Sequence, residues 1–209
     1  MSVKVSLFIS VFIAALLWFW MFSPWTSGLV NFWVSMSCSA LILSALAFSG
    51  RRKGCKTVFE PAMWKQVSIG ILLAIALWGI FWVGDFLSGL MFDFARGQVD
   101  AVYGMKDGSS PAAIALLLIF LIGPAEEYFW RGYVQKTLSG TAGPTAAMFI
   151  TAVIYALVHI WSFNFMLVMA ALVAGGVWGL IYRLKPSLLP ALIVSHALWD
   201  ALVFVILPI

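Results

Sequence analysis

Six ionisable side chains interrupt apolar stretches in the second half of this sequence. A charged group costs about 2.5–3.5 kcal/mol at the centre of a membrane-spanning helix, so groups in such positions usually serve a function. Both histidines of the chain are among the six. The candidates for a functional site are therefore Glu126, Glu127, Arg131, His159, His196 and Asp200.

Hydrolysis is the first chemistry that these residue types can support. A carboxyl group among apolar residues is a stronger base than the same group in water, so Glu126 suits a general base that activates water. The imidazole of His159 or His196 can orient that water or stabilise developing negative charge. These roles together describe an intramembrane hydrolase.

Two other interpretations fit the same residues. Glu126, His159, His196 and Asp200 offer two imidazoles and two carboxylates, which would satisfy a divalent metal such as zinc. The sequence contains no His-Glu-x-x-His helix that would support this interpretation. The third interpretation is a set of buried ion pairs that fix helix packing, or a proton relay in a small transporter. The residues alone leave all three open.

The composition shows which elements must position these groups. Of the 209 residues, 64% are apolar and only 10% are charged, whereas ordinary soluble domains are about 25% charged. The 11 Trp and 17 Phe residues suit helices with interfacial aromatic belts better than the alternating strands of a lipid-facing barrel. We therefore expect an all-α, polytopic transmembrane helical bundle.

Seven apolar stretches are long enough to cross a bilayer. A cytoplasmic N-terminus puts ten of the 12 Lys and Arg residues on one side, as the positive-inside rule requires. The basic stretch 51–56 then serves as a topology anchor, and the polar segment 92–110 is a loop on the other side, either a lid or a connection. The seven stretches are 3–22, 28–49, 67–91, 111–138, 144–161, 163–183 and 187–208.

The candidate residues are expected at similar depths in the membrane. At 1.5 Å per residue, Glu126 lies about 15 Å from Lys136, His196 about 16 Å from Lys185 and His159 about 22 Å from Pro144, and each of these three reference residues lies at the cytoplasmic end of its span. Within helices, Glu127 with Arg131 and His196 with Asp200 are four residues apart and share a face. Glu126 is rotated by about 100° from Glu127 and can face another wall of the same site.

Four sequence elements resemble the CAAX-protease and bacteriocin-processing (CPBP) family of intramembrane proteases, which includes type II CAAX prenyl endopeptidases. Their order and spacing over residues 124–200 make the resemblance specific, although it covers little more than a third of the chain. The elements are Glu126, Glu127 and Arg131 followed by Gly132; Tyr155 with His159; the small residues Ala171, Gly175 and Gly179; and His196 with Asp200.

The resemblance implies a role for each of these residues. Glu126 with His159 activates a water to attack a peptide bond, and His196 with the residue at 200 stabilises the oxyanion. Glu127, Arg131 and Tyr155 support the site. Tyr155 stands where the family usually has Phe. Asp200 stands where the prenyl endopeptidases have Asn, and an ionised Asp cannot donate a hydrogen bond to an oxyanion. Asp200 is therefore either protonated or orients His196.

We expect residues 1–110 to form N-terminal transmembrane helices that are not diagnostic of function, and residues 111–209 to form the catalytic helical core. The resemblance implies an integral protein of a prokaryotic cell membrane that cleaves a membrane-anchored protein or peptide. We expect the protein to require no cofactor, with a divalent metal such as zinc left open, and to bind no nucleic acid. The alternative is a non-enzymatic immunity protein or a small proton-coupled transporter that uses the same polar groups.

Small and aromatic residues outside the candidate site receive structural interpretations. Gly175 and Gly179 are four residues apart and allow close helix packing within the bundle. Pro124 removes a backbone hydrogen bond and can kink its helix. Five Trp residues lie near the ends of predicted spans and are most simply interpreted as interfacial anchors. They are Trp18, Trp20, Trp25, Trp64 and Trp161.

Overall fold

The structure, a computed structural model, describes residues 3–50 and 62–209. Within these residues it contains helices and no strands, and seven helical segments are long and apolar enough to cross a membrane. The predicted all-α membrane bundle is confirmed, and the predicted anchor 51–56 lies outside the described residues. The spans are α1 (Val3–Phe22), α2 (Phe32–Ser49), α3 (Met63–Met91), α5 to α7 (Pro111–Ala142), α8 with a 3-10 turn (Pro144–Ser162), α9 (Phe165–Leu184) and α10 with its flanking turns (Pro186–Ile206).

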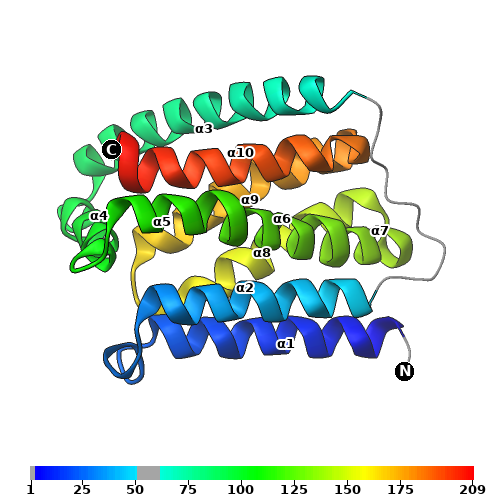
Figure 1. The fold of residues 1–209 in the computed structure, drawn as a ribbon, viewed down its shortest axis with the longest axis horizontal. Helices are drawn as coiled ribbons and strands as arrows, with labels where there is room; N and C mark the ends of the chain where they lie inside the picture. Colours follow the sequence, from blue (N-terminus) through cyan, green and yellow to red (C-terminus); the bar gives the residue numbers. More distant parts are fainter. Residues whose placement is uncertain (1–2, 51–61) are drawn as a thin grey trace.

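The spans run roughly parallel or antiparallel to one another (Figure 1). Helices α1 and α2 lie side by side along one edge of the view, and α3 lies along α10 at the opposite edge. Gly70 permits the close approach of α3 to α10, because a Cβ there would lie 2.7 Å from the Ala191 carbonyl oxygen. Helices α8 and α9 pack on each other in the interior. The bundle thus places its middle spans between these two pairs.

The fourth span is not a continuous α-helix. It consists of α5 (Pro111–Leu117), a π-helical turn, α6 (Gly123–Phe129), a second π-helical turn and α7 (Lys136–Ala142). Pro124 has no N–H and its ring clashes with the carbonyl four residues earlier in a regular α-helix, and a π turn before it accommodates both. A π turn therefore lies on each side of the α-helical segment that carries the two glutamates.

Gly123 sets the distance between α6 and α10 (Leu189–Ala201). A Cβ at this position would lie 2.7 Å from the Cα of Ala197 and 2.8 Å from its backbone nitrogen. Since backbone atoms cannot move aside as a side chain can, only glycine permits this approach. The contact brings the helix of Glu126 and Glu127 against the helix of His196.

The segment 92–110, predicted as a loop, contains the helix α4 (Ala95–Tyr103). Gln98 ties α4 to the start of α9: its backbone carbonyl accepts a hydrogen bond from Asn164 Nδ2 at 2.7 Å, and its Oε1 accepts one from the Met166 N–H at 3.0 Å. The prediction of a loop was wrong because tertiary contacts of this kind order a segment whose composition is polar. Figure 1 shows α4 beyond the ends of the long spans, at the side opposite the N-terminus.

Apolar side chains cover the outside of the bundle as well as its interior. Phe8, Leu72 and Phe120 are exposed by 72%, 67% and 74%, whereas Trp130 and Trp178 are buried in the interior. Such an apolar exterior requires lipid as its solvent. The chain is therefore an integral membrane protein.

Candidate active site

Glu127 links two helices through one carboxylate oxygen. Its Oε1 accepts a hydrogen bond from Arg131 Nη1 at 2.7 Å and another from His196 Nδ1 at 2.9 Å. Glu127 and Arg131 are fully buried, and their side chains meet across the four-residue spacing seen in the sequence. The supporting pair expected from the sequence is present, and it also holds a histidine of α10.

Arg131 connects Glu127 to the remaining walls of the site. Its Nη2 donates to the Gly175 carbonyl oxygen of α9 at 3.0 Å. Its guanidinium carbon lies 5.1 Å from the ring centre of Tyr155 and 5.4 Å from that of Trp178, within the range of cation–π attraction. One buried cation therefore contacts four residues on three helices, α6, α8 and α9. Arg131 was one of the ten Lys and Arg residues that the sequence assigned to one side of the membrane. It lies inside the bundle, so it does not count as a cation of that side.

The His196 ring has a carboxylate oxygen near each of its two nitrogens and an aromatic ring stacked on one face. Trp178 stacks on its ring with centres 4.0 Å apart and planes at 19°, and the Trp178 indole donates to Ser195 Oγ at 3.1 Å. Asp200 Oδ2 lies 3.4 Å from Nε2, across the ring from Glu127. This geometry fits Asp200 as a residue that orients His196, one of the two possibilities that the sequence left open.

Glu126 faces away from the ion pair of its neighbour. Its side chain is 4% exposed, forms a hydrogen bond with the Tyr155 side chain and makes no ion pair with any described residue. Its second oxygen, Oε2, has no hydrogen-bond partner in the described part of the chain. The two adjacent glutamates thus differ: Glu127 is held by an ion pair through its Oε1, whereas Glu126 makes no ion pair with a described residue. The Oε2 of each has no hydrogen-bond partner in the described part of the chain.

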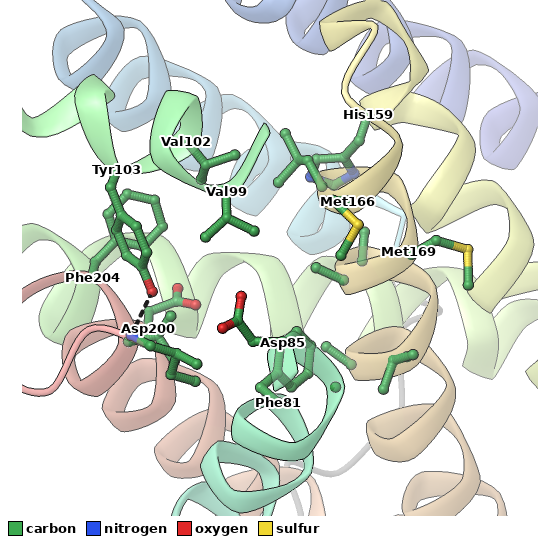
Figure 2. Close-up of a pocket in the computed structure, with 18 of the residues that line it drawn as sticks. Phe81, Asp85, Val99, Val102, Tyr103, His159, Met166, Met169, Asp200 and Phe204 are labelled. Atoms are coloured by element: carbon green, nitrogen blue, oxygen red, sulfur yellow. Dashed lines mark hydrogen bonds between the residues drawn. The ribbon is translucent and has the colours of Figure 1, made fainter. Parts of the chain in front are cut away.

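The candidate residues meet at a cavity of about 600 Å³ with mainly apolar walls. The walls come from every long span and from α4, and Figure 2 shows Asp85 and Asp200 among them, with Met166 and Met169 of α9. No Lys or Arg lines the cavity within the described residues. The structure thus brings together five residues predicted separately from sequence, which are Glu126, Tyr155, His159, His196 and Asp200.

At the α4 end, the cavity is bordered by charged and polar side chains. Asp85 Oδ2 lies 3.6 Å from Arg96 Nη1, while Arg96 is held mainly by Asp100 at 2.9 Å. Burial raises the pKa of Tyr103 above its ordinary value, so its hydroxyl stays neutral. It accepts a hydrogen bond from the Ile209 N–H (Figure 2). The cavity thus extends from the buried polar site toward this end of the bundle.

One comparison with known proteins gave a match. The family model described as type II CAAX prenyl endopeptidase Rce1-like matches residues 108–202. This segment is an Rce1-like domain. The match agrees with the family that the resemblance indicated, and it supports an intramembrane protease of the CAAX type in general terms. Comparisons with curated proteins and with solved structures gave no match.

The Rce1-like domain covers rather less than half of the chain and contains every site residue predicted from the sequence. Its first helix is α5 and its last is α10. The walls of the cavity, however, also include Phe22 of α1, Met36 of α2 and Phe81 of α3. The N-terminal spans, which showed no diagnostic sequence pattern, therefore complete the cavity of the domain.

Trp18 of α1 contacts His159 directly. Its indole Nε1 donates to His159 Nε2 at 3.0 Å, and the Nδ1 of the same ring lies 2.8 Å from the Tyr155 carbonyl oxygen. Trp18 is fully buried, so its interpretation as an interfacial anchor was wrong. No sequence pattern links a residue of the first span to one of the fifth, and its position near a span end suggested the interface instead.

The histidines are engaged within the protein rather than arranged around a metal. His159 has a partner at each ring nitrogen, and both nitrogens of His196 face carboxylate oxygens. In the described part of the chain, no three His, Cys, Asp or Glu residues are grouped as ligands of one ion. These side chains do not fit a metal site as they stand.

Replacing Gly175 with Ala is expected to lower the free energy of unfolding by about 1–3 kcal/mol. The new Cβ would lie 2.8 Å from Tyr155 Cδ1 and 3.5 Å from Arg131 Nη2, two groups that the site holds in place. Gly176→Ala is the matched control because nothing lies within 4 Å of its Cβ position. Denaturant unfolding of both variants in detergent checks this, and equal stability would contradict the packing role.

Proposed function

We propose that this protein hydrolyses a peptide bond in a membrane-anchored protein, with Glu126 as the general base. The observation that supports this is the buried Glu126 carboxyl group at the cavity wall, whose Oε2 has no partner among the described residues. A base of this kind needs a lone pair without a protein partner and a site from which bulk water is excluded. The family match supports the reaction class.

In the proposed reaction, the Glu126 carboxylate accepts a proton from a water as the water oxygen attacks the carbonyl carbon. The C–N bond then breaks, and Glu126 passes the proton to the leaving nitrogen. The products are a carboxylic acid, which keeps the second proton of the water, and an amine, and Glu126 returns to its starting form. Tyr155 contributes by binding the Glu126 carboxyl group and so fixing its position at the cavity wall.

His196 is the proposed stabiliser of the tetrahedral oxyanion. Its Nδ1 lies 2.9 Å from Glu127 Oε1, whereas Nε2 lies 3.4 Å from Asp200 Oδ2. Nε2 is therefore the less tightly held of the two nitrogens. An Nε2–H at the cavity wall can shift its hydrogen bond from Asp200 to a substrate oxygen. Glu127, itself held by Arg131, fixes the orientation of the His196 ring. His159 assists at the same cavity.

The proposed substrate is a protein or peptide with an apolar segment, because the cavity walls are apolar and the site lies inside the bundle. We place the protein in a prokaryotic cell membrane with its N-terminus in the cytoplasm, the orientation that the distribution of Lys and Arg favours. In this orientation the cavity extends toward the outer half of the membrane. The rival function, transport or immunity through binding alone, predicts no cleaved product.

A comparison of protein termini tests the proposal with no assumption about which protein is cleaved. Membrane-proteome termini are compared between cells that carry the wild type and cells that carry Glu126→Gln at matched, folded abundance. Asp93→Asn is the control, since Asp93 is exposed and does not line the cavity. Uncleaved membrane proteins seen only with Glu126→Gln support the proposal. Identical termini in all three strains would favour binding or transport.

A further inference from the structure

The two hydrogen bonds of His159 determine where its proton lies. An indole N–H is a donor only, so His159 Nε2 must accept the bond from Trp18 and carries no proton. A carbonyl oxygen is an acceptor only, so Nδ1 carries the proton and donates to Tyr155. The ring is therefore neutral, and the lone pair of Nε2 is occupied by Trp18.

While these two hydrogen bonds persist, His159 cannot accept a proton from a water. The family resemblance implies that His159 helps Glu126 to activate a water, and a neutral imidazole can accept a proton only through its free lone pair. While the indole occupies Nε2 at 3.0 Å, a water cannot form an in-plane hydrogen bond to that nitrogen. His159 nevertheless lines the cavity with Glu126, as Figure 2 shows for the histidine.

The next turn of α1 shows how a substrate can act on this bond. Phe22, four residues after Trp18, lines the cavity and contacts the His159 ring with centres 5.6 Å apart. Trp18 meets the same ring edge-on at 5.8 Å. Because Trp18 and Phe22 lie on one face of α1, a chain that enters the cavity against Phe22 pushes on the turn that carries the indole.

We propose that Trp18 is a positioning residue that caps His159 Nε2 in the substrate-free protein, and that substrate entry along α1 displaces the indole and exposes this nitrogen to the catalytic water. The inference rests on the proposed hydrolytic function. It assigns the first span, which lies outside the Rce1-like domain, a direct part in the active site.

Histidine labelling tests the cap without any substrate. Diethyl pyrocarbonate acylates an unprotonated, accessible imidazole nitrogen, and the chain contains two histidines, so mass spectrometry reads each separately. A nitrogen that is exposed in only a small fraction of molecules reacts in proportion to that fraction. Trp18→Phe, which keeps an aromatic ring but removes the N–H, is therefore expected to accelerate His159 labelling about tenfold or more.

Trp20→Phe is the matched control, because Trp20 lies on the same helix and is 47% exposed on the outside of the bundle. It is expected to label as the wild type does, and His196 is the internal reference in every sample. Unchanged His159 labelling in folded Trp18→Phe would overturn the cap. This result would not bear on Glu126, whose test is the comparison of termini, so the two proposals fail separately.

Kinetics with a substrate found from the termini separates a cap from a structural contact. Removing a cap lowers KM and leaves kcat unchanged, since less binding energy is spent on displacing the indole. A fall in kcat with unchanged KM would show that Trp18 supports His159 instead. If Trp18→Phe does not fold, the indole resonance of Trp18 is followed by NMR in Glu126→Gln, which binds substrate without cleavage. An indole signal that stays hydrogen-bonded at saturation would overturn the proposal.

Discussion

Glu126→Gln is expected to lower the turnover of the purified protein by about 10²–10⁴-fold, the usual contribution of a general base. Gln has almost the same size, and its amide oxygen can accept the hydrogen bond from Tyr155, but it cannot take a proton from water. Glu126 makes no ion pair with a described residue, so its replacement breaks none. The unfolding midpoint should therefore stay at the wild-type value.

Two variants complete this experiment. Asp93→Asn changes an exposed carboxyl group in the same way and should leave turnover unchanged. Glu126→Asp keeps a carboxylate but withdraws it by one methylene, so its turnover should fall between those of the wild type and Glu126→Gln. Turnover of Glu126→Gln near the wild-type rate, measured with folded protein in nanodiscs, would remove Glu126 from the mechanism.

The membrane spans could be predicted because lipid imposes one dominant constraint on them. About twenty apolar residues are needed to cross the hydrocarbon layer, and this signal is strong enough to find all seven spans and most of their ends. Helix α4 could not be found in this way because it is short, polar and ordered by contacts such as those of Gln98 with Asn164. Periodicity carries no information about such contacts.

The candidate site could be predicted where its geometry is local. Four-residue spacing placed Arg131 beside Glu127, and the structure shows that contact at 2.7 Å. The contacts that join distant spans were missed: Glu127 with His196, and Trp18 with His159. Each depends on how two helices are rotated about their axes. The π turns around Glu127 alter that rotation, so a regular helical wheel cannot predict it.

Arg131→Ala is expected to lower the free energy of unfolding by about 3–5 kcal/mol, more than any other single change considered for this chain. Glu127 would be left as a buried carboxylate with His196 as its remaining partner, and the Gly175 carbonyl would lose its donor. Arg183→Ala is the control, since Arg183 bonds Thr145 at an exposed position and should change stability by about 0.5 kcal/mol or less. Denaturant titration in detergent measures both.

A double variant separates the cost of an unpaired charge from the cost of lost packing. Glu127→Gln with Arg131→Met removes both charges and keeps similar side-chain volumes, so it should recover much of the stability lost in Arg131→Ala. Turnover should stay low, because His196 Nδ1 then faces a neutral amide in place of a carboxylate. Restored stability with restored turnover would show that the ion pair only holds the fold. Restored stability alone would show that the Glu127 charge also acts on His196.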